Sequence, residues 1–257
     1  MFFTVLTIFP EMFDPFWEHG IVRRAIEHKI IRAAAVNIRN FAEDRHQATD
    51  DRPYGGGSGM VMKPEPLAAA IRKVSQTMPG AKTILLTPQG KMFSQQMARA
   101  LASSRSLILV CGRYEGVDER ICDDLIDYEI SIGDYVLTGG ELAGMVIMDA
   151  VTRLIPGALG GEDAAEKDSF ADGLLEHAHY TRPRIFEDRE VPEVLLSGHH
   201  QEIDRWRRES SLMRTLLKRP DLLESRELSD EEIEILGRWG SQIGKILDRH
   251  RRLTKEF

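Results

Sequence analysis

The sequence predicts an α/β domain with a parallel sheet, then a linker, then a small all-α domain. Short runs rich in Val, Ile and Leu alternate with segments of helical periodicity up to Pro156, and this alternation is typical of a parallel sheet with helices on both faces. Residues 158–172, ALGGEDAAEKDSFAD, have the small and acidic composition of a linker. No convincing strand follows them. We therefore place the α/β domain at residues 1–160, a flexible linker at 161–173 and the helical domain at 174–257.

The individual elements follow from local patterns. Runs of β-branched and other apolar residues predict strands at 5–9, 35–40, 83–86, 107–110 and 129–132. Apolar residues at helical spacing predict helices at 17–31, 65–77, 94–103, 118–127, 145–155, 199–219 and from 229 to about residue 253. Ser94 is a candidate N-cap, and Ser229 with Glu232 has the spacing of a capping box.

Composition excludes several classes of protein. The net charge of −7 argues against a protein that coats nucleic acid along its whole surface, although a local basic groove stays compatible with it. No apolar run reaches the roughly 18 residues of a membrane span, and we expect no membrane partner. Cys111 and Cys122 lack a CxxC spacing and are expected to be free thiols, which indicates a cytoplasmic protein.

Three predicted strands end in loops that contain glycine. These loops are TPQG at 87–90, CGRYEG at 111–116 and IGDYVLTGG at 132–140. Because the carboxyl ends of parallel strands meet at one edge of a sheet, we expect the three loops to converge there. Glycine has no Cβ, so a ligand can approach the backbone closely at such positions. A ligand site is therefore the favoured interpretation, and a set of tight turns is the alternative.

A fourth glycine-rich segment, YGGGSGM at 54–60, lies in a long polar stretch from 41 to 60. It lacks the Gly-Lys-Ser/Thr of a phosphate loop, and Met62 stands where a dinucleotide fingerprint needs its last glycine. A flexible lid, a backbone surface for substrate and a disordered loop all remain open.

Four of the eight histidines lie between residues 177 and 200, at His177, His179, His199 and His200. This HxH and HH pattern fits no common zinc motif and has no cysteine nearby, so we favour polar or RNA contacts and predict no metal site. On the predicted helix 199–219, Arg207, Arg214 and Lys218 form a cationic stripe. Another face of this helix carries Ile203, Trp206, Met213 and Leu217.

Two further signals have competing explanations. Asp168 and Asp172 lie in the linker, either as solvated acidic residues or as a catalytic base on a segment that orders with substrate. Arg153 lies near the end of the helix after the third loop, where it either interacts with the helix C-terminus or stabilises an anion.

Together these motifs resemble the bacterial tRNA (guanine-37-N1)-methyltransferases of the SPOUT class. The matching segments are YGGGSGMVM, LTPQG, LVCGRYEGVDER, SIGDYVLTGGE, DAVTRLIPG, DSFADGLLEHAHYTRP and SGHHQEIDRWR, in order and nearly from end to end. The resemblance implies a deep trefoil knot, which is otherwise nearly absent from proteins. It also implies a homodimer with each active site at the interface, and S-adenosylmethionine as cofactor. Magnesium dependence is a property of the family, but the sequence has no carboxylate cluster that announces a magnesium site.

The resemblance also implies residue roles. The cofactor would be held by Leu86, Thr87, Pro88, Gln89, Gly90, Gly112, Ile132, Gly133, Asp134, Tyr135, Val136, Leu137, Gly139 and Gly140. Asp172 would be the general base for the guanine N1 proton, and Arg153 would stabilise the charge that develops at O6. The predicted contacts to the tRNA, including its anticodon arm, are Glu115, Ser169, Gly57, His199, Arg207 and Arg214. The alternatives are a non-catalytic RNA-binding protein with a nucleotide-shaped pocket and a SPOUT enzyme that acts on another RNA.

Overall fold

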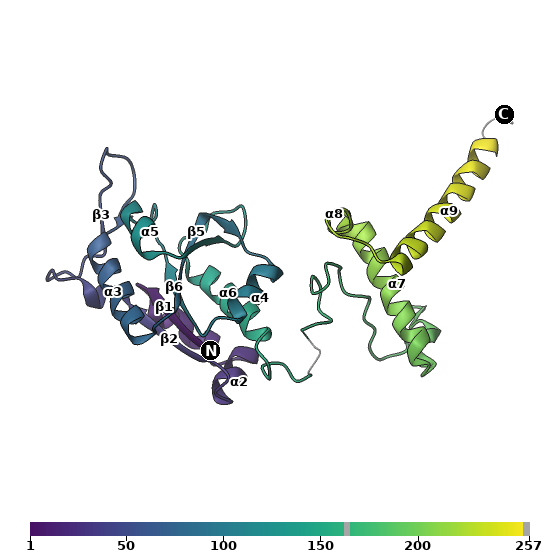
Figure 1. Cartoon of the computed structure of the whole chain (residues 1–257), viewed down its shortest axis with the longest axis horizontal. Helices are drawn as coiled ribbons and strands as arrows, with labels where there is room; N and C mark the ends of the chain where they lie inside the picture. Colours follow the sequence, from purple (N-terminus) through teal and green to yellow (C-terminus); the bar gives the residue numbers. More distant parts are fainter. Residues whose placement is uncertain (162–164, 254–257) are drawn as a thin grey trace. The chain divides into compact units, whose positions relative to one another are not determined.

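The computed structural model describes residues 1–161 and 165–253, and the chain folds as two compact units. The first unit runs from Met1 to Ala165 and the second begins at Glu166 (Figure 1). Within the described residues, none of the helices combines the length and apolarity that a bilayer-spanning segment needs.

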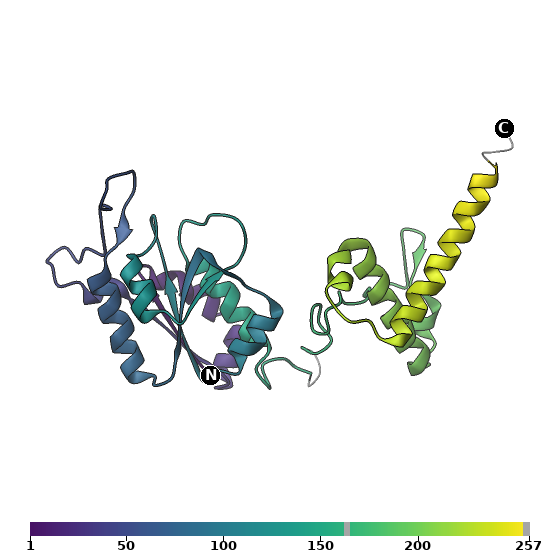
Figure 2. The ribbon, with the colours of Figure 1, turned by 45° about the horizontal axis from the view of Figure 1, so that its top comes forward.

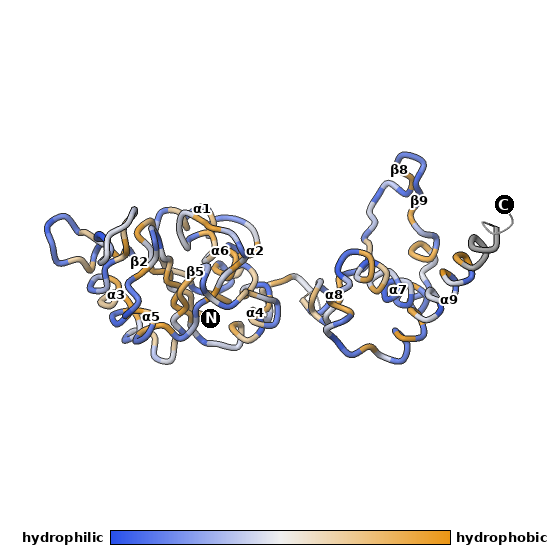
Figure 3. The backbone as a smooth tube through the Cα atoms, turned by 90° about the horizontal axis from the view of Figure 1, so that it is seen from above, coloured by the Kyte–Doolittle hydropathy of each residue, from blue (hydrophilic) through white to orange (hydrophobic). Residues whose placement is uncertain are grey.

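A five-stranded parallel sheet forms the centre of the first unit. Its strands lie in the order β2-β1-β6-β5-β7. Their bounds are Phe2–Thr7 for β1, Arg32–Asn37 for β2, Lys82–Met92 for β5, Ser106–Cys111 for β6 and Tyr128–Ser131 for β7. All six residues of β6 are buried, as expected for the middle strand of a sheet covered on both faces. The three central strands, β1, β6 and β5, contribute most of the buried strand residues to the hydrophobic interior of this unit (Figure 3). The predicted parallel sheet is confirmed.

Helices cover both faces of this sheet (Figure 2). Alternate residues of β6 face two separate apolar clusters, with Leu107 and Leu109 in one and Ile108 and Val110 in the other. The first cluster includes residues of α2 (Gly20–Glu27), α4 (Gln95–Ala102) and α6 (Glu141–Arg153). The second includes residues of α3 (Pro64–Thr77) and α5 (Glu119–Leu125). The three-layer arrangement leaves the carboxyl ends of the central strands open for a site.

Short elements complete the first unit. Before α2 the chain forms η1 (Pro10–Phe13) and α1 (Asp14–Trp17), and η2 (Ile38–Phe41) follows β2. The long polar segment contains a small antiparallel pair, β3 (Asp50–Asp51) and β4 (Val61–Met62). Residues 60–62 then lie alongside the loop after β6. The Glu115 N–H donates to the Met60 carbonyl at 3.0 Å, and the Met62 N–H donates to the Gly116 carbonyl at 2.9 Å. The glycine-rich loop is thereby anchored beside the second of the three strand-end loops.

The second unit is mainly helical. It contains η3 (Glu193–Leu196), α7 (His200–Lys218), α8 (Pro220–Glu224) and α9 (Asp230–Leu253). Its core is small, with Leu174, Leu212 and Ile235 buried and Leu223 and Trp239 packed against them. The predicted capping box is confirmed, because the Ser229 N–H donates to Glu232 Oε2 at 2.8 Å and the Glu232 N–H donates to Ser229 Oγ at 3.3 Å.

Several sequence-based expectations need correction. The second unit is not purely helical, because β8 (Ile185–Phe186) and β9 (Arg189–Glu190) form a hairpin too short to leave an alternating pattern. The helix expected at 145–155 already begins at Glu141. On α7 the fully buried positions include Leu212 and Thr215, whereas Leu217 is 73% exposed. Helical periodicity alone did not show which side of α7 meets α9. The linker expected at 161–173 overlaps the second unit from Glu166 on, and residues 162–164 lie outside the described residues.

Candidate functional site

A cavity of about 380 Å³ opens at the carboxyl ends of β5, β6 and β7. All three glycine-bearing loops line it, so the predicted convergence is confirmed. Of the residues predicted to hold a cofactor, those that line the cavity are Leu86, Thr87, Pro88, Gln89, Gly112, Ile132, Gly133, Tyr135, Val136, Leu137, Gly139 and Gly140. Gly90 and Asp134 belong to the same loops but are not among the lining residues. In the sheet, β6 lies on one side of β5 and β7 lies on the other, so the order of successive strands changes direction at this point. Such a switch point is where α/β sheets bind ligands.

Two glycines are required by close approach of the backbone. Ile130 pairs with both Leu86 and Lys91, so residues 87–90 bulge out of β5 toward the cavity. A Cβ on Gly90 would collide with the Ile130 backbone nitrogen. A Cβ on Gly140 would lie 2.8 Å from Cys111 Cα, and the Gly140 N–H donates to the Gly112 carbonyl at 2.8 Å. The third loop is therefore pressed directly onto the end of β6.

A buried carboxylate holds this junction together. Glu141, the first residue of α6, is 1% exposed and accepts hydrogen bonds from Thr7 Oγ1 at 2.7 Å and Arg113 Nε at 3.1 Å. The Arg113 guanidinium also lies over the Phe9 ring, 4.3 Å from its centroid. Arg113 pairs with Gly139 in an isolated antiparallel bridge. The Glu141 carboxylate thus connects β1, the loop after β6 and the start of α6.

Glu115, predicted to position the guanine, also lines the cavity. Its side chain packs against Gly59, where a Cβ would lie 2.6 Å from Glu115 Cγ. Gly57, the predicted substrate contact in the same glycine-rich loop, is exposed and has a φ of +123°, a conformation that favours glycine. Glu115 therefore lies where the cavity meets the loop that Gly57 belongs to.

Arg153 lies away from the cavity of its own chain. It is the last residue of α6, whereas Gly140 and Ala143 at the other end of that helix line the cavity. Twelve helical steps separate Glu141 from Arg153, which is about 18 Å along the helix axis. This position in the last turn also suits a favourable interaction with the helix dipole.

Asp172 and Ser169 belong to the second unit, in a hydrogen-bonded turn. The exposed Asp172 accepts a hydrogen bond at Oδ1 from the Leu174 N–H at 3.2 Å, and Ser169 Oγ accepts from the Glu176 N–H at 3.0 Å. The Phe170 N–H donates to the Leu174 carbonyl at 2.7 Å. The turn presents the Asp172 carboxylate at the surface of this unit.

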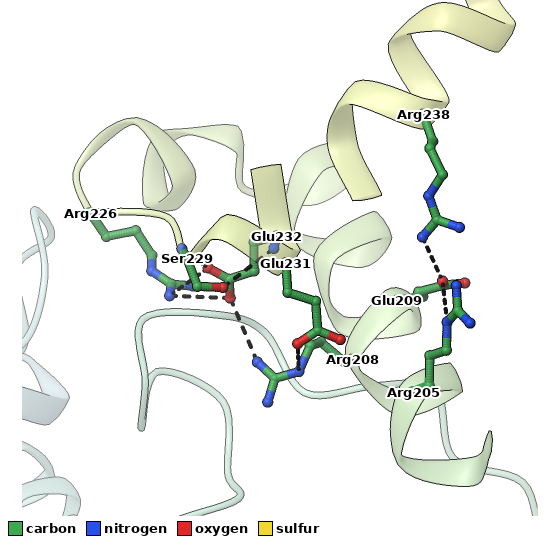
Figure 4. A network of polar contacts seen from close by, with 8 residues as sticks. All are labelled: Arg205, Arg208, Glu209, Arg226, Ser229, Glu231, Glu232 and Arg238. Atoms are coloured by element: carbon green, nitrogen blue, oxygen red, sulfur yellow. Dashed lines mark hydrogen bonds and ion pairs between the residues drawn. The ribbon is translucent and has the colours of Figure 1, made fainter. Parts of the chain in front are cut away.

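The cations of α7 divide into two groups. Arg208 pairs with Glu231 at the start of α9, and Arg205 pairs with Glu209 on α7, which in turn contacts Arg238 of α9 (Figure 4). Glu232, 1% exposed, also pairs with Arg226 at 3.1 Å. These contacts fasten α9 onto α7.

The predicted RNA contacts on α7 lie elsewhere on the helix. Arg207 is exposed and pairs with Asp204 at 3.1 Å. Arg214 is half-buried and donates from Nε to the Glu176 carbonyl at 3.1 Å. His199 precedes the helix and lies 3.4 Å from Glu202. Arg207 and His199 stay accessible, whereas Arg214 also has a structural role.

Two of the four histidines lie beside each other and beside a carboxylate. His177 and His179 lie side by side with ring centroids 4.5 Å apart, and His179 Nε2 lies 2.8 Å from Glu176 Oε1. Burial lowers the pKa of His177, and the neighbouring His179 and Arg207 lower it further. The adjacent Glu176 was not singled out by sequence reasoning, because a lone acidic residue beside a histidine carries no specific signal.

The cavity fits the cofactor that the resemblance implies. Its volume lies within the roughly 300–1,000 Å³ of small-molecule sites. The side chains of Leu86 and Ile132 offer apolar surface for a flat ring, while Glu115 and Glu119 offer carboxylates for a cationic methyl donor. Glycine-bearing loops on three sides make backbone groups accessible. The residues present therefore suit an adenosine-containing cation such as S-adenosylmethionine.

Comparison with known proteins agrees with this geometry. The family described as tRNA (Guanine-1)-methyltransferase TrmD matches residues 1–225. The chain belongs to this family. It is 60% identical over 247 residues to a tRNA (guanine-N(1)-)-methyltransferase of Desulfatibacillum aliphaticivorans, covering 96% of this chain and 94% of the relative. Proteins of the same name from Syntrophotalea carbinolica and Geobacter sulfurreducens are each 56% identical over 236 residues, covering 92% of this chain and 95% and 96% of the relatives.

Some residues of this family member's cavity were missed by sequence reasoning. Arg113, Glu119 and Cys122 line it, and Glu141 holds Arg113 in place through a hydrogen bond. Arg113 and Glu141 stand in motifs that the sequence singled out, CGRYEG and LTGGE, but nothing in either motif shows that the two side chains meet across 28 residues.

Proposed function

We propose that this chain transfers a methyl group from S-adenosylmethionine to N1 of guanosine 37 in tRNA. The observation that carries the proposal is the convergence of the three glycine-bearing loops on one cavity at the ends of β5, β6 and β7, in a chain of the tRNA (guanine-1)-methyltransferase family. The relatives' printed names support guanine N1 of tRNA as the acceptor. When bound, S-adenosylmethionine supplies an electrophilic methyl group.

The residues of the chain would prepare the guanine. N1 carries a proton at neutral pH, and it becomes a nucleophile only when a base removes that proton. Asp172 is the proposed base and Arg153 the proposed stabiliser of negative charge at O6. Glu115, which lines the cavity, and Ser169, three residues before Asp172 in the same turn, would orient the guanine. Deprotonation of N1 with the charge held at O6 leaves the N1 lone pair available for the methyl group.

We further propose that a second copy of the chain completes each site. Arg153 lies about 18 Å along α6 from the cavity edge of its own chain, so a neighbouring copy is the simpler source of this group. An apolar face supports such pairing, because Leu142 and Val146, one turn apart on α6, are 51% and 45% exposed, and the preceding Val136 is 86% exposed. Closure by the partner would also exclude water from the exposed Asp172 carboxylate.

The trefoil knot and a cytoplasmic location belong to the same proposal. The close approach of Gly140 to Cys111 and Gly112 supports a threaded arrangement of the loops after β6 and β7. Two free cysteines support a reducing compartment. On the second unit, Arg207 and Lys218, both exposed on α7, would contact phosphates of the anticodon arm.

The decisive experiment maps the modified nucleoside in unmodified tRNA after reaction with the purified protein and S-adenosylmethionine. We expect 1-methylguanosine at position 37. Asp172→Asn should abolish methyl transfer while cofactor binding, measured by calorimetry, persists. Glu224→Gln, which makes the same chemical change at another exposed position of the second unit, should keep full activity.

Two results would contradict the proposal. Cofactor binding without turnover by the unaltered protein would favour a non-catalytic RNA-binding protein. Methylation at another nucleotide would favour a different RNA substrate. Near-normal turnover by Asp172→Asn would leave the reaction in place but remove Asp172 as its base.

A further inference from the structure

A cluster of metal-ligating side chains lies in the second unit, outside the residues that line the cofactor cavity. Glu176, His177 and His179 each place one ligand atom within 4.8 Å of the other two. His179 Nε2 and Glu176 Oε1 are already 2.8 Å apart. Among the residues that the structure describes, this is the group of three or more such side chains that comes close enough to hold an ion.

The backbone that carries these ligands is held in place by α7. The Leu175 N–H donates to Thr215 Oγ1 at 2.9 Å, and the Ala178 N–H donates to Ser210 Oγ at 3.0 Å. Arg214 Nε donates to the Glu176 carbonyl at 3.1 Å. Ligand binding therefore has to order three side chains but not the main chain, which lowers its entropic cost.

The side chains differ in accessibility in a way that suits ion entry. The His179 side chain is 63% exposed and that of Glu176 is 31% exposed. His177 is more enclosed. Its Nδ1 is buried and lacks a hydrogen-bond partner within the described chain, and its ring lies 6.3 Å from that of Trp206. Among the described residues, this buried imidazole nitrogen neither donates nor accepts a hydrogen bond. A ligand, or a changed orientation of the ring, would give it a partner.

The donor set selects the kind of ion. Two imidazoles and one carboxylate suit Zn²⁺, whereas Mg²⁺ and Ca²⁺ prefer oxygen ligands alone. Zinc binds nitrogen and oxygen ligands at about 2.0–2.2 Å, which places two ligands of a tetrahedron about 3.4 Å apart. Because the ligand atoms lie within 4.8 Å of one another, rotations of the His177 and His179 side chains that shorten a separation by at most about 1.4 Å would meet this geometry. The fourth position would face solvent and take water.

One charge opposes the site. Arg207 lies close enough to lower the pKa of His177 electrostatically, and a cation there would also repel a metal ion. Arg207 is however paired with Asp204 at 3.1 Å, which offsets part of its field. The Glu176 carboxylate is the ligand that supplies negative charge at the site itself.

We propose that Glu176, His177 and His179 form a three-residue Zn²⁺ site with one open position. The site fastens the segment after the Asp172 turn and does not depend on methyl transfer. The sequence argued against zinc because HxH followed by HH fits no common zinc motif and no cysteine lies nearby. In the structure the ligand atoms of the HxH and of the preceding Glu176 come within 4.8 Å of one another.

The test uses the full-length protein without a polyhistidine tag, stripped of metal, and titrated with ZnCl₂ by calorimetry. We expect one equivalent to bind. His177→Ala and His179→Ala should each weaken binding by about 10-fold to 100-fold, the range found when groups that support a metal site are altered. His200→Ala, which removes a histidine outside the cluster, should leave the affinity unchanged. Tetrahedral visible absorption of bound Co²⁺ would report the geometry.

A second measurement needs no variant. Zinc should protect His177 and His179, but not His200, from modification by diethylpyrocarbonate, with the sites mapped by mass spectrometry. The absence of stoichiometric zinc binding would overturn the proposal. Zinc affinity equal to that of the unaltered protein in both single variants, or protection at other histidines only, would overturn it as well. Methyl transfer is not part of either readout, so failure of the zinc site and failure of the proposed activity are distinguishable.

Discussion

The buried carboxylate of Glu141 offers a sharp test of how the cavity is held together. In Glu141→Ala the hydroxyl of the fully buried Thr7 loses its acceptor, and the Arg113 guanidinium, whose side chain is 18% exposed, loses its ion pair. Removing one partner of a buried pair costs about 3–5 kcal/mol. Arg113 keeps its contact with the Phe9 ring and some contact with water, so we take the lower part of this range, about 3 kcal/mol. For a chain of this size each kcal/mol corresponds to about 2–4 °C, so the melting temperature of the first unit should fall by about 6–12 °C.

Thermal unfolding monitored by circular dichroism measures this effect, and hydrogen exchange of peptides from β1 and β6 assigns it to the first unit. Glu27→Ala is the matched control. It breaks the exposed pair of Arg23 and Glu27, whose side chains are 58% and 51% exposed, and it should change stability by less than about 0.5 kcal/mol. Glu141→Gln keeps an acceptor for Thr7 and should have an intermediate effect. Equal melting temperatures for Glu141→Ala and Glu27→Ala would refute the reasoning.

The remaining predictions concern packing and reactivity. Gly140→Ala places a Cβ 2.8 Å from the backbone of β6, so it should destabilise the first unit by about 1–3 kcal/mol and weaken cofactor binding in calorimetry. Gly237→Ala meets no atom within 4 Å inside α9 and should instead stabilise the protein by up to about 1 kcal/mol in urea unfolding. Burial and nearby acidic residues raise the pKa of Cys122 to about 11, so at pH 8 its alkylation should be about a hundred-fold slower than that of a free cysteine, and its rate should rise with pH. S-adenosylmethionine should slow the alkylation further, because Cys122 lines the cavity. A rate at pH 8 equal to that of free cysteine would contradict this prediction. Leu212→Ala, at a fully buried position, should lower the unfolding free energy of the second unit by about 2–5 kcal/mol in urea unfolding. Leu217→Ala, at a position that is 73% exposed, should leave it nearly unchanged. A larger loss of stability in Leu217→Ala than in Leu212→Ala would contradict the assigned core of α7.

Local signals were sufficient wherever a residue's role depends on its near neighbours in the chain. The capping box at Ser229 and the N-cap at Ser94 were correct, because a cap involves residues two or three positions apart. The alternation of strands with helices predicted the parallel sheet for the same reason. The β8–β9 hairpin was missed because two residues are too few to show a period.

The sequence by itself determined the layered architecture, and from it the convergence of three loops at one edge of the sheet, since parallel strands all end on the same side. It also determined the family, through motifs spread along nearly the whole chain. Only the tertiary structure decided which distant side chains meet. It brought Glu141 onto Thr7 across 134 residues, and it placed Arg153 one helix length from the cavity of its own chain. Such contacts depend on side-chain directions and packing across the fold, which local periodicity does not encode.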